Sequence, residues 1–528
     1  MNTVKFYLFF AIFLFGFKNI IGQTPDGKEM RGVWVATVKH LDYPSSSFLS
    51  VKEQKREFVE MLDFFSETGI NAVFFQVRPA ADAFFDSPYE PWSEWLTGEQ
   101  GKAPHPYYDP LKFMIKECRK RGMQFHAWIN PFRAVATIEF ADISKNHVTN
   151  RKPEWFFTYD VNKYFDPGIP EVRKYIVKII KDIVRRYDID GIHFDDYFYP
   201  YPVRDENNKI VQVPDYKTYQ KYNSGFNNIE DWRRNNLDLF IKDVYDAVKN
   251  ENPYISFGIA PSGIWRNKGK DPKGSDTRGF AHYDYLYSDV LKWLKNGWVD
   301  YVAPQIYWPV GNKYADYKTL VEWWSKHTYG KQLYIGHAVY NAGKDAASRA
   351  WRNPEELPKQ IRINRKTPEV LGSIFYRASS LKKNPLGFCD SLKNNYYKIK
   401  TTPPEIPFIQ PPDTFIIAEN DNKYELPPTR TDACVPFNVF VTELGNKIMV
   451  SWESKEKSKG LTYIVYKTAS ESSKQIKTTS IIAETNKTYI LLKRRRLPFF
   501  RKKYGITVTA TGKSQTESPA SKVVFVKL

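Results

Sequence analysis

Cysteine is scarce in this sequence, because only Cys118, Cys389 and Cys434 occur among 528 residues. They are scattered, odd in number and without paired spacing, which argues against a disulfide framework and against a cysteine-based zinc site. The sequence also holds no HExxH, no GxSxG and no Cys–His signature. It therefore gives no indication of a metal-dependent or serine-nucleophile mechanism, and we expect no cofactor.

Long apolar runs are equally rare. The stretch from Phe6 to Phe17 follows Lys5 and ends shortly before Gly22, which is the pattern of a secretory signal peptide over residues 1–22. An uncleaved membrane anchor is the alternative, although about a dozen residues are too few to span a bilayer comfortably. No later segment is long and apolar enough to cross a membrane. We therefore expect an exported protein that works in the periplasm or outside the cell, with no integral membrane segment after cleavage.

Acidic residues are fewer than basic ones, 59 against 78, which gives a formal net charge of +19. This charge suits an anionic partner such as nucleic acid, an acidic polysaccharide or an anionic cell envelope. Because the sequence holds no zinc finger, RNP motif or basic zipper, we expect no nucleic acid. Aromatic residues make up 16% of the chain, which fits either a large core or a cleft lined with rings that stack on sugars.

Residues 31–397 alternate short β-rich runs with helical stretches. Several runs, such as AVFFQV and SFGIA, are apolar on both faces, as strands covered by helices require. Eight such alternations favour a (β/α)8 TIM-like barrel over residues 29–400, with a doubly wound open sheet as the alternative. The expected strands are Val33–Val38, Ala72–Val77, Gln124–Ile129, Gly191–Asp195, Ser256–Ala260, Tyr301–Ile306, Leu333–Ala338 and Gly372–Tyr376. The expected helices are Glu53–Thr68, Pro110–Arg121, Glu171–Tyr187, Asp231–Lys249, Ser288–Asn296, Lys318–His327 and Pro354–Asn364.

Two insertions interrupt this alternation, at Ala134–Phe165 and Tyr199–Glu230. Each follows the end of a strand directly, so both should lie at the carboxyl face of the barrel. Barrel enzymes build their active sites at that face. The insertions are therefore expected to border the site.

The pattern changes after residue 400. Residues 401–433 are rich in proline and predict a linker, and residues 434–528 predict a small all-β sandwich. Trp452, Tyr463 and the segment YGITVTATG resemble a fibronectin type III domain, a fold that implies no catalysis. The basic run from Lys493 to Arg496 suits contact with an anionic cell envelope, although a solvated hairpin is the simpler interpretation. The expected strands are Lys447–Trp452, Tyr463–Tyr466, Thr488–Leu492, Tyr504–Thr509 and Lys522–Val526.

The sharpest chemical signal is the segment DGIHFDDYFYP at residues 190–200. It predicts a buried strand that ends in Asp195 and Asp196. Two like charges held side by side favour a raised pKa for one of them and a role as proton donor. Helix capping is the structural alternative for such an aspartate, but a long insertion follows here and no helix. We expect Asp196 to be the acid, by a narrow margin.

Polar and aromatic residues gather at the ends of the other strands, so the sequence predicts substrate contacts around the pair. Each also has a structural interpretation, because Arg78 could be an ion-pair partner, His126 an interior residue and the tryptophans core. The histidines and aspartates near the pair leave a divalent metal as a minor alternative, and we expect none. The predicted substrate-binding residues are Gln76, Arg78, Asp82, Trp92, His126, Trp128, Asn130, Arg133, His193, Tyr197, Trp265, Gln305 and Trp308.

Several separated motifs occur in order along the chain, among them RGVWVATV (31–38), FQVRP (75–79), HAWINPFR (126–133), GIAPSGIW (258–265) and PQIYWP (304–309). Together with DGIHFDDYFYP they resemble the bacterial glycosyl hydrolase-like 10 family. That family includes exported proteins that resemble the enzyme cleaving peptidoglycan glycan strands stripped of their stem peptides. The resemblance implies a TIM-like barrel, action on glycosidic bonds and a site around Asp195 and Asp196.

The mechanism follows only in part. Ordinary glycosidases place two carboxyls on either side of the scissile bond, about 5 Å apart or more, which adjacent aspartates would struggle to do. We therefore expect substrate-assisted cleavage at an N-acetylhexosamine, with Asp196 as acid/base, Asp195 as the orienting group and Tyr307 as a donor. The alternative is an ordinary pair of Asp196 with a carboxylate from another loop, Asp82, Glu94 or Asp276. A non-catalytic carbohydrate-binding scaffold of the cell envelope is the alternative to an enzyme.

Overall fold

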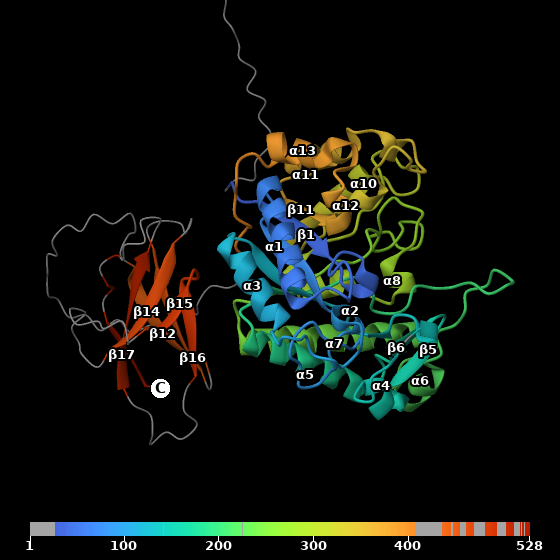
Figure 1. Cartoon of the computed structure of the whole chain (residues 1–528). Helices are drawn as coiled ribbons and strands as arrows, with labels where there is room; N and C mark the ends of the chain where they lie inside the picture. The colour runs from blue at the N-terminus through green and yellow to red at the C-terminus, as the bar shows by residue number, and fades with distance from the viewer. Residues whose placement is uncertain are drawn as a thin grey trace, which may run out of the picture. The chain divides into compact units, whose positions relative to one another are not determined.

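The computed structural model describes residues 27–406, apart from 141 and 224, and residues 436–527, apart from 445–446, 455–460, 469–480, 494–502, 512–517, 519 and 522. The expected signal peptide, most of the expected linker, Cys434 and most of the basic run after residue 493 lie outside the described residues. The chain divides into two compact units, residues 1–410 and 411–528 (Figure 1). Each unit is described by itself.

Eight parallel strands of the first unit close into a barrel in which the last strand pairs with the first. This confirms the predicted (β/α)8 fold. The barrel strands are β1 (Met30–Val35), β2 (Ala72–Arg78), β3 (Gln124–Ile129), β7 (Gly191–Phe194), β8 (Ser256–Ile259), β9 (Tyr301–Val302), β10 (Gln332–Ala338) and β11 (Val370–Tyr376).

Helices follow the strands and surround the barrel (Figure 1). A capping box formed by Ser50 and Glu53 begins α1, and Gly69 ends that helix with a φ of 86°. The longer helices are α1 (Val51–Thr68), α3 (Pro110–Lys120), α5 (Pro170–Arg186), α7 (Ile229–Glu251), α9 (Val290–Lys295), α10 (Tyr317–Ser325) and α11 (Glu356–Lys366). The shorter ones are α2 (Glu94–Thr97), α8 (His282–Tyr285), α12 (Ala378–Lys382) and α13 (Phe388–Ser391).

Two barrel strands, β1 and β9, differ most in extent from the prediction. β1 ends earlier than expected, because the backbone N–H groups of residues 37 and 38 bond to the side-chain oxygen of Gln76 and not to a backbone carbonyl of β2. β9 keeps only the first two residues of the expected strand, since Pro304 has no N–H with which to continue a ladder. Gln305 then forms isolated bridges with Ser262, which follows β8, and with Gly336 of β10.

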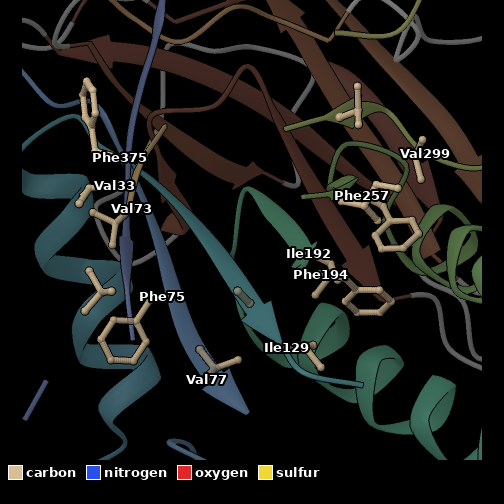
Figure 2. Packing of buried hydrophobic residues seen from close by; sticks show 14 of the residues in the cluster. Val33, Val73, Phe75, Val77, Ile129, Ile192, Phe194, Phe257, Val299 and Phe375 are labelled. Atoms are coloured by element: carbon tan, nitrogen blue, oxygen red, sulfur yellow. The ribbon is translucent and has the colours of Figure 1, made fainter. Parts of the chain in front are cut away.

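Side chains of the strands alternate between the helices and the barrel interior, as the twofold period of a strand requires. The outward set forms the main core, and Figure 2 shows part of it, including Val33, Val73, Phe75, Ile192, Phe194 and Phe257. The inward set is a smaller cluster that includes Trp34, Phe74, Trp128, Tyr301 and Tyr334. Large interior rings fit because glycine stands opposite them: a Cβ on Gly258 would lie 2.1 Å from the Tyr301 ring.

The two insertions lie side by side at one edge of the barrel, where Figure 1 places β5, β6, α4 and α6 together. The hydroxyl of Tyr159 in the first insertion donates to the Val211 carbonyl of the second and accepts from the Val203 N–H. The first insertion holds a three-stranded antiparallel sheet, in the order β4-β6-β5. Its elements are β4 (Arg133–Val135), α4 (Val148–Arg151), β5 (Phe156–Tyr159) and β6 (Asn162–Phe165), and the second insertion holds α6 (Tyr216–Tyr222).

The chain stays bound to the amino end of the barrel beyond residue 400. The carbonyl of Thr401 accepts a hydrogen bond from the Asn71 side chain, and that of Glu405 accepts one from Gln332. The first residues of the expected linker are therefore packed against the barrel.

The second unit consists of two antiparallel sheets with the strand orders β12-β13-β16 and β15-β14-β17-β18. Both sheets contribute to one core, which contains Trp452, Tyr463, Ile490 and Val508. The strands are β12 (Phe437–Leu444), β13 (Lys447–Glu453), β14 (Thr462–Thr468), β15 (Ile481–Thr485), β16 (Tyr489–Lys493), β17 (Lys503–Thr511) and β18 (Val524–Lys527). Across the described parts of both units, no helix has the length and apolar character needed to span a bilayer.

Candidate active site

A pocket of about 290 Å³ lies at the carboxyl ends of the barrel strands. Its volume is close to the lower end of the range for small-molecule sites, roughly 300 Å³, which suits a single sugar unit. The lining residues lie on or soon after β1, β2, β3, β7, β9 and β11, so most of the barrel contributes to it. They are Trp34, Ala36, Val38, Leu41, Gln76, Trp128, Arg133, Asp195, Asp196, Tyr197, Tyr201, Gln305, Tyr307 and Tyr376.

Asp195 and Asp196 lie together in this pocket, and each is more than nine-tenths buried. Neighbours within a strand point to opposite faces, but β7 ends one residue before the pair, so both side chains reach the same space. The Asp195 carboxylate accepts a hydrogen bond of 2.6 Å from Nδ2 of Asn130. The Asp196 carboxylate accepts one from the Tyr201 hydroxyl. The Gln305 side chain, whose Nε2 donates to the Ala260 carbonyl at 2.8 Å, also favours the charged form of Asp196.

Asn130 is held in one orientation by its other neighbours. Its Oδ1 accepts hydrogen bonds from Nε2 of Gln76 at 2.5 Å and from the Arg133 guanidinium at 2.9 Å. The Gln76 side chain is fixed in turn, because its Oε1 accepts the two backbone N–H groups that follow β1. With its oxygen occupied in this way, Asn130 must direct its N–H group at Asp195.

Burial raises the pKa of both carboxyl groups, because the charged form is poorly solvated there. The pKa of Asp195 rises to about 7, and the charge of Asp196 is the second cause of that rise. The Tyr201 hydroxyl and the Gln305 side chain oppose the rise in the pKa of Asp196, and the Arg133 guanidinium lowers the pKa of both carboxyls. The pair therefore holds a proton near neutral pH, so that one member can donate it while the other stays negative.

Aromatic rings form much of the remaining wall. Tyr307 stacks on Tyr376 with ring centroids 6.0 Å apart, and Trp34 meets Tyr376 edge-on at 6.2 Å. Burial and the nearby carboxylates raise the pKa of Tyr307 well above its usual value, so its hydroxyl keeps its proton. The pocket thus offers ring surface and a phenol donor beside the two carboxyls.

The structure brings eight of the predicted site residues into the pocket lining. These are Asp195, Asp196, Tyr307, Gln76, Trp128, Arg133, Tyr197 and Gln305. Asn130 does not line the pocket but donates a hydrogen bond to the Asp195 carboxylate. The remaining seven predicted residues lie elsewhere.

Arg78 and Asp82 are fully buried in the structure that supports the loop after β2. The Arg78 guanidinium makes a two-point ion pair with Glu90, at 2.6 and 2.7 Å, and both side chains have no exposed surface. Asp82 accepts the backbone N–H of Ala80, and burial raises its pKa to about 7. Both side chains therefore stabilise the loop internally and do not line the pocket.

His126 and His193 lie below the pocket inside the barrel, in a chain of hydrogen bonds. The Trp34 indole can only donate, so Nε2 of His193, at 3.0 Å, accepts and its Nδ1–H donates to the Tyr301 oxygen. Tyr301 then donates to Nδ1 of His126, whose Nε2–H donates to Gln124. Burial lowers the pKa of both histidines, that of His126 to about 3, so both are neutral. Within the described residues, no group of histidine, cysteine and carboxylate side chains is placed to hold a metal ion.

The other three predicted residues are tryptophans that pack away from the pocket lining. Trp92 contacts the Tyr107 ring edge-on, and Trp265 stacks on Trp323 at 6.0 Å. The Trp308 ring lies against Gly263. A place near the end of a strand was therefore not enough to put these rings in the pocket lining.

Three aromatic lining residues were missed: Trp34, Tyr201 and Tyr376. Trp34 and Tyr376 lie at inward positions near the ends of the first and last strands, and the strand period could have indicated them. Tyr201 comes from an insertion, where no periodicity applies. His282 was also missed; its Nε2 lies 3.3 Å from the Asp196 backbone oxygen and supports the strand end from below.

Comparison with known proteins identifies the family. The sequence profile of the family described as glycosyl hydrolase-like 10 matches residues 29–352. The chain belongs to the glycosyl hydrolase-like 10 family. It is 40% identical over 503 residues to glycosyl hydrolase YngK of Bacillus subtilis, covering 94% of this chain and 93% of that protein. It is also 40% identical over 379 residues to glycosyl hydrolase DigH of Escherichia coli, covering 67% of this chain and 84% of that protein. The protein is thus a glycoside hydrolase.

Solved structures resemble the chain more distantly. The glycoside hydrolase domain of PgaB (BpsB) from Bordetella bronchiseptica is 12% identical, with a TM-score of 0.44, over 69% of this chain and 98% of that one. The α-L-fucosidase isoenzyme 2 from Paenibacillus thiaminolyticus is 14% identical, with a TM-score of 0.43, over 70% of this chain and 49% of that one. The barrel assignment rests on the strand pairing described above.

Proposed function

We propose that this protein is an exported hydrolase that cleaves glycosidic bonds in an N-acetylhexosamine polysaccharide, the glycan strand of peptidoglycan. The observation that carries this proposal is the pair of adjacent buried carboxyls, Asp195 and Asp196, in a ring-lined pocket that suits one sugar unit. The family supplies the reaction, which is hydrolysis of a glycosidic bond.

The lining of the pocket supports substrate-assisted cleavage. Ordinary glycosidases need a carboxyl on each side of the scissile bond. Among the described residues that line this pocket, Asp195 and Asp196 are the acidic ones, and both come from the end of β7. The alternative partners do not fit, because Asp82 is buried outside the lining, and Glu94 and Asp276 are not part of it. An acetamido group on the substrate would supply the missing nucleophile.

The hydrogen bonds favour a division of roles opposite to the sequence-based expectation. Asp196 accepts from the Tyr201 phenol, and Tyr201 and Gln305 both favour its charged form. Asp195 accepts from the weaker amide donors of Asn130 and the Tyr197 backbone and carries the pKa of about 7. In this proposal Asp195 gives its proton to the leaving oxygen, and the Asp196 carboxylate steadies the N–H of the acetamido group. The Tyr307 hydroxyl donates a hydrogen bond that orients the acetamido oxygen for attack on the anomeric carbon.

The choice of peptidoglycan rests on compartment and charge. The apolar stretch at residues 6–17 fits a signal peptide, which would deliver the enzyme to the cell envelope. A net charge of +19 would raise its local concentration at an anionic envelope. The alternating N-acetylhexosamines of peptidoglycan carry the acetamido group that the mechanism needs.

The C-terminal unit has a separate proposed role as a fibronectin type III-like spacer that contacts the envelope. Its three-stranded and four-stranded sheets share one core, and Trp452 meets Tyr463 edge-on inside it at 5.4 Å. Such a module holds an enzyme near a surface without taking part in the chemistry.

The test compares matched glycans. Purified protein is given peptide-free peptidoglycan strands, N-acetylated chitin oligosaccharides and the same oligosaccharides after deacetylation, and released chains are measured by mass spectrometry. The proposal expects cleavage of the acetylated glycans and loss of cleavage on deacetylation. Equal cleavage of the deacetylated oligosaccharides would exclude the neighbouring-group mechanism. Binding without turnover by wild type would favour the carbohydrate-binding scaffold.

A further inference from the structure

Tyr201 stands out because no feature of the sequence assigned it a role, yet its hydroxyl donates directly to the Asp196 carboxylate. It lies in the insertion after β7 and lines the pocket, so it approaches the pair from a loop and not from a barrel strand. Desolvation and the Asp196 charge raise the pKa of Tyr201 far above its usual value. Its hydroxyl therefore stays protonated and serves Asp196 as a donor.

The Tyr201 ring is held in place by other aromatic rings. One face stacks on Phe280, with centroids 4.9 Å apart and planes at 19°, and Phe280 stacks in turn on Tyr285 at 5.1 Å. Tyr201 also meets the Tyr197 ring edge-on, with centroids 5.3 Å apart. The stack comes from the segment after β8, so a second loop fixes the direction in which the hydroxyl points.

The two carboxyls consequently have unequal surroundings. Asp196 accepts from the Tyr201 phenol, whereas Asp195 accepts from the Asn130 amide at 2.6 Å and from the Tyr197 backbone N–H at 3.4 Å. A hydrogen bond to a carboxylate favours its charged form. A phenol is a stronger donor than an amide N–H, so Tyr201 favours the negative charge on Asp196 and leaves the shared proton to Asp195. Besides Tyr201, the charged and titratable groups that face Asp196 are Asp195, Arg133, Tyr197, His282, Tyr307, Tyr340 and Tyr376.

We propose that Tyr201 is a positioning residue that keeps Asp196 ionised and directs the shared proton of the pair to Asp195. Its position is set by the Phe280–Tyr285 stack, so the assignment of acid and base depends on two loops outside the strands. This inference rests on the proposed function, since it assigns protonation states within the same site.

The test removes one oxygen atom. Tyr201→Phe keeps the ring and its stacking on Phe280 but deletes the donor to Asp196. We expect kcat to fall roughly tenfold to a hundredfold with KM within about twofold, the size expected for a hydrogen bond to a charged group. The acid limb of the kcat/KM profile should move to higher pH, because Asp196 then keeps a proton more readily. Tyr285→Phe is the matched control, since it removes a phenol oxygen from the far end of the same stack and should leave the profile unchanged.

A second measurement does not need turnover. In Asp195→Asn protein labelled with ¹³C at aspartate carboxyls, the Asp196 signal is titrated with and without the Tyr201→Phe change. The inference expects Asp196 to titrate at higher pH when the hydroxyl is gone. An Asp196 titration and a pH profile that both stay unchanged in folded Tyr201→Phe protein would overturn it. If wild type cleaves no glycan but the carboxyl signal still moves, the proposed function fails and the role of Tyr201 stands.

Discussion

The interior of the barrel holds two groups of buried polar side chains with opposite properties. In the lower group His126, Tyr301 and His193 are linked by hydrogen bonds in which every donor meets an acceptor, and burial keeps both histidines neutral. In the upper group Asp195 and Asp196 place two acids side by side, and burial makes them compete for a proton. Burial of polar groups therefore stabilises the fold where all partners match and creates reactivity where two like charges remain.

The largest expected effect is on the upper group. Asp195→Asn and Asp196→Asn should each lower kcat by roughly a hundredfold to ten-thousandfold, the range for loss of a general acid or base. The measurement is release of chains from peptide-free peptidoglycan strands. Asp246→Asn, an exposed aspartate paired with Lys242 on α7, is the control. If either pocket variant keeps full activity, that carboxyl has no part in the chemistry.

An activated leaving group should separate the two roles. On an N-acetylhexosamine oligosaccharide with a dinitrophenyl leaving group, protonation is not needed, so the variant of the true proton donor should regain most of its rate. We expect Asp195→Asn to be rescued and Asp196→Asn not to be. The reverse pattern would restore the sequence-based assignment, in which Asp196 is the acid.

A buried ion pair outside both groups should have a comparably large effect, but on stability. Arg78→Met leaves the Glu90 carboxylate buried without its partner, which should cost about 3–5 kcal/mol of unfolding free energy. Urea unfolding measures this cost. Replacing both partners, as Arg78→Met with Glu90→Leu, should recover most of it, because no charge is then stranded. A low cost for the single change would mean that Glu90 is solvated or protonated.

The upper group should make the unfolding free energy of the protein depend on pH. Folded Asp195 keeps its proton up to about pH 7, whereas the unfolded chain releases it near pH 4, so folding takes up a proton between these values. Unfolding free energy should therefore fall as pH rises through this window, by about 1.4 kcal/mol for each unit of pKa difference. Asp195→Asn removes this pH dependence. The difference in unfolding free energy between the variant and wild type, measured with urea, should therefore shift in favour of the variant from pH 4 to pH 8. A constant difference would contradict the raised pKa.

The smallest expected effect is on the lower group. His193→Phe preserves a ring but leaves the Trp34 N–H and a lone pair of the Tyr301 oxygen without a partner, at a cost of about 1–3 kcal/mol. Thermal unfolding should show this loss. The pH dependence of kcat should keep its shape, because a neutral histidine contributes no titration. A change in that shape would mean that His193 exchanges protons with the pair.

The regular part of the molecule could be predicted from the sequence, and the irregular part could not. All eight barrel strands were predicted, and with them the position of Asp195 and Asp196 at a strand end, because the strand period and the apolar runs are local signals. Arg78 and His126 were assigned to the substrate because their internal partners could not be recognised from the sequence. Glu90 lies in the loop after β2, and Tyr301 lies in another strand. Tyr201 was missed for the corresponding reason, since the orientation of a loop depends on the ring of Phe280, about eighty residues later.

The fixed direction of the hydrogen bonds from Trp34 to Gln124 has a consequence for acidic surroundings. The acceptor nitrogen of each histidine is already occupied by a donor, so neither histidine readily takes up a further proton. Acidification to about pH 4 should therefore leave these hydrogen bonds, and the position of Trp34, unchanged. In the exported location proposed above, the enzyme would meet such fluctuations without cytoplasmic buffering. The pocket would keep its shape as the pH changes, while the charge of Asp195 and Asp196 changes with it.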